Sequence, residues 1–425
     1  MLSFQDLSFS TVNEKIRVEI YNLFYKEFDQ AELSSLGKVT IKYKKLEIQG
    51  LSQDAVQKKF MQFFRKYKKD LAYKLNGNKA IYVDEDLGLP LIGLNFLGIL
   101  DKGSEIIELK PITNCNADCI FCSVNEGPSS NKKIDFVVDK DFLVQETKAL
   151  LKYKSASGMS IWINPHGEPT LYAKLSELCR DLLEDEHVKD IHIITNGILL
   201  TKKMADELCL IAEQSKKEIH ITLSMSALSV EPGKASKVNK KGLSNARLMM
   251  GEVYTLTTVM RNLEYAADKL PITITPVYVK GMNDEEMKNL VLFADKLAKS
   301  HKNQKIGIAI QKYCENKRGR NPVNEESWDD FFAFLKQLEQ ETGKTLTPHL
   351  GKIKETKQLP LLCKKDDRIL VKIICQGRYP RDRLGIYETK QGSRAVALIG
   401  CDADKGTIKA EVIQSKYNMV VGKCT

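Results

Sequence analysis

The chain has 425 residues, of which 43% are hydrophobic and 28% charged, and it carries a formal net charge of +10. At about 100–200 residues per domain, this length predicts two to four domains. The composition is that of a globular protein and excludes a disordered chain, a disulfide-stapled miniprotein and a collagen-like fibre. The longest apolar stretch, residues 87–100, contains three glycines and a proline, so it is too short and too broken to span a bilayer.

The first residues, MLSFQDLSFS, have neither a basic segment nor an uninterrupted apolar segment of the kind that forms a secretory signal. The ten cysteines are irregularly spaced outside one cluster. This spacing is more typical of metal binding or catalysis in a reduced compartment than of a disulfide framework. We therefore expect a cytoplasmic protein.

Basic side chains are concentrated at the ends of the chain. Residues 359–425 contain 13 Lys and Arg against 7 Asp and Glu, and residues 1–88 contain 15 against 12. Five of the 12 arginines lie in the C-terminal segment, where an even spread would place about two. The distribution favours a polyanionic partner, and the alternative is a lysine-rich solvated surface.

In chain order, residues 1–99 mix strand-like and helix-like pieces. Residues 38–48 have apolar side chains near period two, residues 52–75 are helix-like, and residues 80–83 form a short strand candidate. We therefore predict an α+β extension at the N-terminus.

From about residue 100 to residue 355, six strand candidates alternate with helix-like segments. The strands are expected at residues 105–109, 160–164, 190–195, 218–224, 272–279 and 305–310, and the helices at 140–154, 172–184, 202–214, 252–269, 284–299 and 325–342. This α/β alternation predicts a parallel sheet with right-handed crossovers. Six units are too few for a closed eight-stranded barrel, so we expect a partial (β/α)6 TIM-like barrel or an open sheet, with functional loops at the C-terminal ends of the strands.

The last segment, residues 356–425, has short apolar runs separated by glycines and no helical period. The runs are residues 369–374, 395–399, 408–413 and 419–421. They predict a small all-β domain, a five-stranded barrel.

Three cysteines follow the first strand of the core at the spacing C-x3-C-x2-C, namely Cys115, Cys119 and Cys122. Three thiolates can hold three irons of a [4Fe–4S] cluster and leave the fourth iron open, whereas clusters that only transfer electrons normally have four cysteine ligands. A structural zinc site would need a fourth ligand with paired spacing, and no nearby Cys or His supplies one. Three buried structural cysteines are the remaining alternative.

Small polar residues follow the next strands of the predicted sheet. The second strand ends in Asn-Pro-His-Gly-Glu-Pro-Thr, which contains Gly167, Glu168 and Pro169. The glycine lets backbone approach a ligand closely, and the glutamate can accept hydrogen bonds from an ammonium group. The third strand ends at Asn196, and the fourth contains Ser224 and Ser226. All of these residues are expected at the same edge of the sheet.

The three cysteines with Phe121, the Gly-Glu-Pro turn and the six βα units resemble the radical S-adenosylmethionine (radical SAM) superfamily over about residues 100–320. The resemblance implies that S-adenosylmethionine binds the open iron through its amino and carboxylate groups and is cleaved to methionine and a 5′-deoxyadenosyl radical. It also implies cofactor contacts from the Gly-Glu-Pro turn, Phe121, Asn196, Ser224 and Ser226. Longer stretches are similar to a mainly archaeal group of radical SAM proteins of undetermined substrate. Lys312 with Arg318 or Arg320 are candidate contacts for a substrate anion, and the alternative is a solvated basic loop.

The C-terminal segment is similar to a TRAM domain, a small β-barrel appended to tRNA-modifying enzymes. The similarity covers about residues 360–425, and the arginines expected to bind nucleic acid are Arg378, Arg381, Arg383 and Arg394. Clustered arginines suit binding to phosphates and stacking on bases. Radical methylthiotransferases carry an additional three-cysteine domain, and because residues 1–99 contain no cysteine, that reaction is disfavoured.

The sequence therefore predicts a radical SAM enzyme that modifies an RNA base, with tRNA as its partner and a low-potential ferredoxin or flavodoxin as its electron donor. The first alternative is a radical enzyme that modifies a protein or peptide. The second is a non-catalytic iron–sulfur protein that binds RNA. The predicted domains are residues 1–99, 100–355 and 356–425.

Overall fold

The computed structural model describes residues 2–232, 239, 241–301, 305–347 and 353–425. The chain forms two compact units. The first unit combines Met1–Gly98, Lys132–Glu146 and Pro360–Thr425, and the second consists of Ile99–Asn131 and Thr147–Leu359. The division into three domains at residues 99 and 355 stays a prediction.

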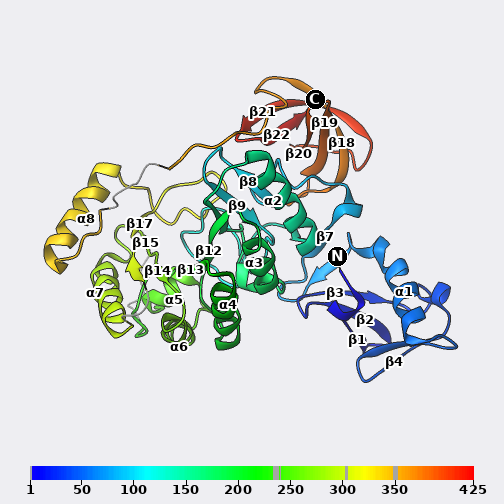
Figure 1. Cartoon of the computed structure of the whole chain (residues 1–425), viewed down its shortest axis with the longest axis horizontal. Coiled ribbons are helices and arrows are strands. Elements are labelled where there is room, and N and C mark those ends of the chain that lie inside the picture. The colour runs from blue at the N-terminus through cyan, green and yellow to red at the C-terminus, as the bar shows by residue number, and fades with distance from the viewer. Residues whose placement is uncertain (1, 233–238, 240, 302–304, 348–352) are drawn as a thin grey trace. The chain divides into compact units, whose positions relative to one another are not determined.

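A seven-stranded sheet in the order β16-β14-β13-β12-β11-β9-β8 forms the centre of the second unit (Figure 1). Every neighbouring pair from β9 to β16 is parallel. Six parallel strands that follow one another in chain order confirm the predicted partial (β/α)6 architecture. The strands are β8 (Gly98–Asp101), β9 (Ile106–Lys110), β11 (Met159–Ile163), β12 (Val188–Thr195), β13 (Glu218–Leu223), β14 (Ile272–Ile274) and β16 (Ile306–Ile308).

Helices connect these strands and pack on one face of the sheet. On β12, Ile191 and Ile193 are fully buried, whereas His192 and Ile194 point to the other face and are half-buried. The second face is therefore the interior of the partial barrel. Within the described ranges, no helix combines the length and hydrophobicity needed to cross a bilayer. The helices are α2 (Lys140–Lys154), α3 (Leu175–Leu183), α4 (Lys202–Ser215), α5 (Asn245–Met250), α6 (Leu256–Ala267), α7 (Asp284–Ser300) and α8 (Trp328–Thr342).

The fifth strand of the core is divided, although the sequence predicted a continuous strand over residues 272–279. β14 ends at Ile274, and β15 (Val277–Tyr278) begins after Pro276. Proline has no backbone N–H and cannot donate to a sheet ladder. β15 instead pairs in parallel with β17 (Gln311–Lys312) in a separate two-stranded sheet. This pair brings the chain after β16 back to the edge where the cysteine loop lies.

The first unit contains a six-stranded sheet in the order β1-β2-β3-β6-β7-β10, in which only β7 and β10 are parallel. Helix α1 (Gln53–Phe64) buries Phe60, Phe63 and Phe64, and Phe60 and Phe63 contact Phe9 and Phe28 of the sheet. The predicted strand at residues 38–48 is a hairpin, and the predicted helix at residues 52–75 ends at Phe64. The strands are β1 (Leu7–Val12), β2 (Lys15–Ile20), β3 (Phe24–Phe28), β4 (Val39–Lys42), β5 (Lys45–Ile48), β6 (Leu71–Tyr73), β7 (Lys79–Val83) and β10 (Ile134–Val138).

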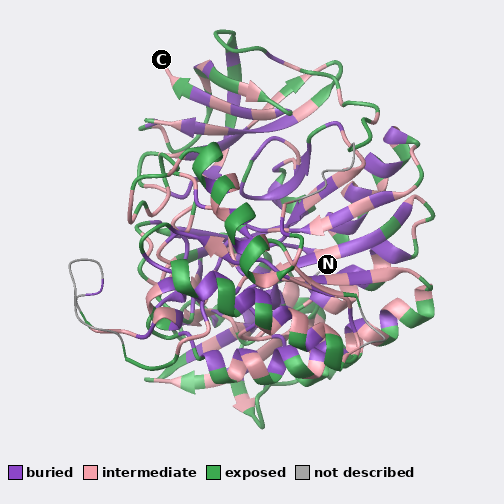
Figure 2. Ribbon diagram, turned by 90° about the vertical axis from the view of Figure 1, so that its left-hand side faces the viewer, coloured by how far each residue is buried: buried purple, intermediate pink, exposed green. Residues whose placement is uncertain are grey.

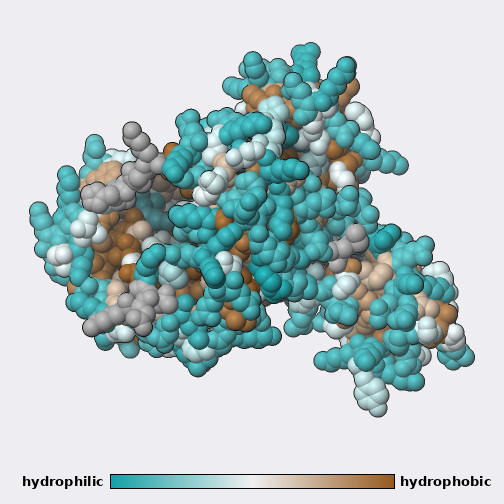
Figure 3. Space-filling view, viewed as in Figure 1, coloured by the Kyte–Doolittle hydropathy of each residue, from teal (hydrophilic) through white to brown (hydrophobic). Residues whose placement is uncertain are grey.

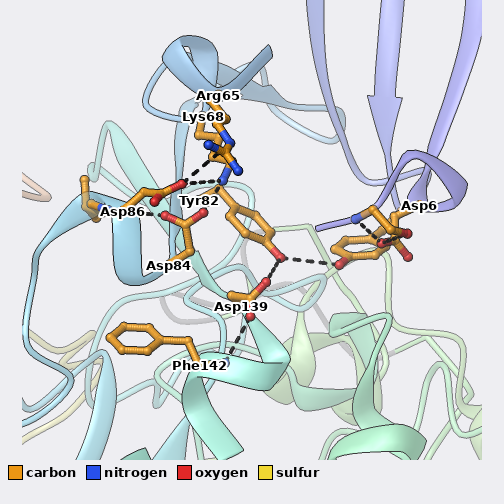
Figure 4. Close-up of polar contacts among 11 residues, drawn as sticks. Asp6, Arg65, Lys68, Tyr82, Asp84, Asp86, Asp139 and Phe142 are labelled. Atoms are coloured by element: carbon orange, nitrogen blue, oxygen red, sulfur yellow. Dashed lines mark hydrogen bonds and ion pairs between the residues drawn. The ribbon is translucent and has the colours of Figure 1, made fainter. Parts of the chain in front are cut away.

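A buried polar network fastens β10 and the start of α2 to β7 (Figure 4). The Tyr82 hydroxyl donates a hydrogen bond of 2.8 Å to the Asp139 carboxylate, which also accepts from the backbone N–H of Phe142 at 3.0 Å. Lys68 forms a short ion pair with Asp84, and their side chains are 6% and 5% exposed. Because an isolated buried charge is costly, each partner depends on the other.

The C-terminal residues form a closed barrel in the order β18-β19-β20-β22-β21, which confirms the predicted five-stranded barrel. Burial alternates along its strands, as the purple segments between pink and green ones show (Figure 2). Within the first unit, Ala395 donates to the carbonyl of Ile92 and Val420 to that of Gly93. Gly93 has a φ of +137°, and a β-carbon there would lie 2.0 Å from the Ala395 oxygen, so only glycine fits. The strands are β18 (Arg368–Gln376), β19 (Arg383–Thr389), β20 (Gly392–Ile399), β21 (Thr407–Lys416) and β22 (Met419–Cys424).

Candidate active site

The three-cysteine loop follows β9 at the C-terminal edge of the parallel sheet. The backbone N–H groups of Asp118 and Ile120 donate to carbonyls at the end of α5, with N···O distances of 3.2 and 2.9 Å. The loop is thereby held against the chain that leads into α6. Its three cysteines line one cavity of about 320 Å³ and are Cys115, Cys119 and Cys122.

The arrangement of these cysteines is compatible with an iron–sulfur cluster, which takes one thiolate for each iron that the protein binds. Within the part of the chain that the structure describes, no three His, Cys, Asp or Glu side chains converge on one metal-ion position. A four-iron cluster does not require such convergence, because each thiolate binds a different iron. The backbone N–H of Glu126 also donates to the Cys122 sulfur at 3.3 Å, as a donor to a thiolate ligand would.

The protein environment favours the protonated form of two of these thiols when no iron is bound. Removal from water, with smaller contributions from Cys119 and Glu168, raises the pKa of Cys115 well above its usual value. Removal from water and the neighbouring Cys122 raise the pKa of Cys119 to about 12. A metal that bound these two sulfurs would therefore have to displace their protons.

The Gly-Glu-Pro turn is bonded directly to the start of the cysteine loop. The backbone N–H of Glu168 donates to the carbonyl of Asn114, the residue before Cys115, at 2.7 Å. A β-carbon at residue 167 would lie 2.1 Å from the same oxygen. Gly167 is therefore required for the close approach of the two backbones, and the turn forms one wall of the cavity.

The Glu168 carboxylate is buried and anchored by four hydrogen bonds. Its Oε1 accepts from the backbone N–H and the hydroxyl of Thr170 and from the hydroxyl of Thr195, at 2.9, 2.6 and 2.6 Å. Its Oε2 accepts from the backbone N–H of Asn196 at 2.8 Å.

Burial raises the pKa of the Glu168 carboxyl group, although these four donors lower it. Since a carboxylate oxygen can accept two hydrogen bonds, Oε2 keeps capacity for a donor in the cavity.

Not all of the residues predicted to bind the cofactor line the cavity. Pro169 and Ser226 do not line the cavity: Pro169 begins a buried 3-10 turn, and the hydroxyl of Ser226 accepts from the backbone N–H of Val277 at 3.0 Å. Both have structural roles in the loops beneath the cavity. The predicted residues that do line it are Phe121, Gly167, Glu168, Asn196 and Ser224.

The segment after β17 forms the opposite wall, and the sequence identified only part of it. Lys312 lines the cavity, as do Tyr313, Cys314 and Asn316, which the sequence had not marked as site residues. The Lys312 side chain is only 2% exposed, and its ammonium lies 3.7 Å from the carboxylate of Glu325. Lys312 was predicted from the sequence, whereas Tyr313, Cys314 and Asn316 were not, because their position depends on the pairing of β17 with β15.

Arg320, predicted as a substrate contact, is instead bonded to the cysteine loop. Its guanidinium pairs with the Asp118 carboxylate at 2.6 Å, and its backbone N–H donates to the Cys122 carbonyl at 2.8 Å. Arg318 is exposed and does not line the cavity. Of the predicted substrate-anion residues, only Lys312 lines the cavity.

Three of the four arginines predicted to bind nucleic acid are buried within the first unit. Arg378, Arg383 and Arg394 are between 4% and 7% exposed. Arg381 remains accessible, with a side chain that is 67% exposed and a two-pronged contact to Asp402 at 2.9 and 2.8 Å. The side-chain partners of the buried arginines are Asp135, Asp404 and Asn418. Of these four arginines, Arg381 alone keeps an accessible side chain.

Comparison with known proteins agrees with the site. Residues 109–294 match the family model described as the Radical SAM superfamily. The chain is 28% identical over 382 residues to an uncharacterized protein of Methanocaldococcus jannaschii. The aligned region covers 83% of this chain and 82% of that protein. It is 26% identical over 199 residues to the GTP 3′,8-cyclase of Aquifex aeolicus, covering 46% of this chain and 55% of the cyclase. The match thus spans about half the length of the cyclase.

Solved structures also resemble the chain at low identity, among them the following two. One is a spore photoproduct lyase variant with bound AdoMet and dinucleoside spore photoproduct, with 10% identity, a TM-score of 0.37 and coverage of 73% of this chain and 74% of the lyase. The other is native anSMEcpe with bound AdoMet, with 19% identity, a TM-score of 0.38 and coverage of 56% and 60%.

Proposed function

Residues 109–294 form a radical SAM domain, so the protein is an enzyme of the radical SAM type, and from this premise we propose that it modifies a base of RNA, with tRNA as the expected substrate. The observation that carries the choice of RNA is the basic outer face of the C-terminal barrel. The TRAM-like character of this barrel is part of the proposal.

The cofactors of this enzyme type are a [4Fe–4S] cluster and S-adenosylmethionine. We propose that Cys115, Cys119 and Cys122 hold the cluster and that Gly167 and Glu168 receive the amino group of S-adenosylmethionine. When bound, the cluster supplies the electron that splits S-adenosylmethionine into methionine and a 5′-deoxyadenosyl radical. The side chains around the cavity position the reacting groups and keep water away from them.

An enzyme of this type also needs an electron donor and a reducing environment. We propose that a small low-potential protein, a ferredoxin or a flavodoxin, supplies the electron and that the reaction takes place in the cytoplasm. Reduced flavodoxin should then replace dithionite in an assay of cofactor cleavage.

The proposed RNA surface lies on three adjacent strands of the barrel, β18, β21 and β22. Arg368 and Lys372 alternate with buried residues on β18 and are exposed. The strand register places the exposed Lys409 of β21 opposite Leu370. It places Glu411 of β21, which is half-buried, between Arg368 and the exposed Lys423 of β22. Four exposed cations around one half-buried carboxylate form a surface of net positive charge that suits a phosphate backbone.

Apolar and aromatic groups accompany these cations, as a surface that binds bases requires. Leu370 is 59% exposed between Arg368 and Lys372. Tyr417, in the turn between β21 and β22, is 42% exposed, with the Lys416 ammonium 5.0 Å from its ring centroid. In Figure 3 hydrophilic side chains project from this part of the first unit with hydrophobic ones between them. An exposed aromatic ring beside cations suits stacking on unpaired bases.

Inside the second unit, Lys312 is the candidate contact for a phosphate of the RNA. Its ammonium is buried in the cavity wall, lies 3.2 Å from the Tyr313 carbonyl and stands 5.1 Å from the ring centroid of Trp328. Its carboxylate neighbour, Glu325, is 3.7 Å away and half-exposed, which makes a weak pair. An incoming phosphate could therefore replace Glu325 as the counter-ion.

Substitution of Lys312 tests this role. K312Q should lower the rate of RNA-dependent turnover at least tenfold, while K317Q, a matched change at an exposed lysine of the same segment, should leave it unchanged. The rates are measured with tRNA as substrate under anaerobic conditions. Equal rates for K312Q and wild type would rule out a phosphate contact at Lys312.

The barrel surface is tested by the salt dependence of tRNA binding. The double variant K409Q/K423Q should bind more weakly and should reduce the slope of log K against log salt concentration by about two, one for each lost phosphate contact. The control K189Q/K203Q removes two exposed charges of the second unit and should bind as wild type does. Identical slopes for the two variants would contradict the proposed surface.

The proposed reaction is tested by mass spectrometry of nucleosides from total tRNA, in cells with and without the gene. One modified nucleoside should be lost in the deletion strain and restored by wild type but not by C119A. An unchanged nucleoside profile together with a missing peptide modification would replace RNA by a polypeptide as the substrate.

A further inference from the structure

Arg320 binds the cysteine loop through almost every hydrogen-bonding group that it has. Its Nε donates to the side chain of Asn125 at 2.8 Å, and Nη1 donates to the carbonyl of Cys119 at 3.4 Å. Its Nη2 lies 2.6 Å from the Asp118 carboxylate, 2.8 Å from the Glu126 carbonyl and 2.9 Å from the Ser129 hydroxyl. One guanidinium therefore joins five residues of the loop that carries the three cysteines.

The backbone around Arg320 approaches the same loop. The N–H of Arg320 donates to the carbonyl of Cys122 at 2.8 Å. A β-carbon at Gly319 would lie 3.0 Å from the Ser123 oxygen, which is tighter than ordinary contact. The two segments thus approach each other closely through their backbones.

The segment that carries Arg320 also forms the cavity wall opposite the Gly-Glu-Pro turn. The Asn321 side chain accepts from the hydroxyl of Tyr313 at 3.1 Å and from the backbone N–H of Asn316 at 3.2 Å. Tyr313 and Asn316 both line the cavity. Arg320 and Asn321 therefore connect the cysteine loop to residues that line the cavity.

We propose that Arg320 is a positioning residue that fixes the cysteine loop in the shape the cluster requires, and that its charge raises the reduction potential of the bound cluster. Reduction adds negative charge to a cluster, so a nearby cation stabilises the reduced state. The guanidinium is 18% exposed and lies 2.6 Å from the Asp118 carboxylate, and the loop also holds the buried Glu126, so the R320Q titration measures the net effect of the Arg320 charge among these groups. This inference rests on the radical SAM domain and does not depend on the substrate being RNA.

The test compares R320Q and R320K with the neighbouring control R318Q, each reconstituted anaerobically with iron and sulfide. The iron and sulfide contents per chain measure how well the cysteine loop holds a cluster. An EPR-monitored redox titration measures the reduction potential of that cluster. R320Q should load less iron, and the cluster that it does hold should titrate at a lower potential than wild type. R320K keeps the charge but not the multiple bonds, so it should load less iron while its cluster titrates near the wild-type potential.

R318Q should match wild type in both measurements. Full loading of R320Q with an unchanged potential would overturn the proposal, and reduced loading with an unchanged potential would remove the electrostatic part of it. If R320Q binds no cluster, the test rests on the comparison of R320K with R318Q. If these two variants have the same iron content and the same EPR spectrum, the positioning role of Arg320 is overturned.

Discussion

Gly167 is the residue where a single added methyl group should have the clearest effect on the cavity. In G167A the new β-carbon would meet the Asn114 carbonyl at 2.1 Å, so the turn must move away from the cysteine loop. Such overpacking costs about 1–3 kcal/mol, and the free energy of unfolding should fall by that amount in urea denaturation. The movement of Glu168 with the turn should also weaken binding of S-adenosylmethionine, measured by calorimetry.

The matched control is G307A in β16, where an added β-carbon meets no atom within 4 Å. This variant should unfold and bind the cofactor as wild type does. Equal behaviour of G167A and G307A would mean that the close approach of the two backbones is not required.

The raised thiol pKa values predict how the cluster-free protein responds to pH. Because removal from water raises the pKa of Cys115 and takes the pKa of Cys119 to about 12, both sulfurs hold their protons at neutral pH. Their reaction with iodoacetamide at pH 8 should be at least tenfold slower than that of glutathione, and it should still be rising at pH 10. Peptide mapping of the alkylated apoprotein measures both rates, and alkylation at the glutathione rate would contradict the assignment.

Motif spacing was sufficient to predict the cysteines and the Gly-Glu-Pro turn, because these residues are close in sequence and follow the ends of strands. The sequence did not predict that three arginines of the barrel, Arg378, Arg383 and Arg394, are buried. Arg378 pairs with Asp135, more than 240 residues earlier, and the sequence carries no signal of that contact. Arg320 was marked for its charge, but its bonds to the cysteine loop depend on how β15 and β17 pair.

At the scale of elements, the buried pair Lys68 and Asp84 is a candidate for a stabilising contact in the first unit. D84A leaves the Lys68 ammonium buried without its main partner, which should cost about 3–5 kcal/mol of unfolding free energy. The comparison is D70A, which breaks a pair with Lys26 in which the Asp70 side chain is 54% exposed, and should cost less than about 1 kcal/mol. If urea denaturation shows that D84A and D70A lose the same unfolding free energy, burial does not strengthen the pair of Lys68 and Asp84.

Regular periodicity predicted elements well where local pattern and tertiary context agree. The helix at residues 140–154 has the expected bounds. The strand at residues 272–279 is broken because Pro276 cannot donate, and the strands β1 to β3 were missed because half-exposed positions on antiparallel strands carry many charged side chains. β10 was missed because it is short and its partner β7 lies about 50 residues earlier in the chain.

For the whole molecule, the burial pattern shows which of the basic side chains at the two ends of the chain are exposed to solvent. Arginines that raised the charge of the tail are largely used inside the first unit, and the exposed charge is mostly lysine. Lysine is a strongly hydrated point charge, so the surface suits phosphates more than specific bases. Any base specificity is then expected from stacking and from the cavity of the second unit.

The central proposal is that Cys115, Cys119 and Cys122 would hold a [4Fe–4S] cluster and that Gly167 and Glu168 would position S-adenosylmethionine for reductive cleavage by it. The direct measurement is 5′-deoxyadenosine formed by the anaerobically reconstituted protein with dithionite and S-adenosylmethionine. Wild type should produce it, and C119A, which removes one cluster ligand, should produce none above the protein-free control. A wild-type protein that carries four irons per chain but yields no 5′-deoxyadenosine, or a C119A variant as active as wild type, would contradict the claim.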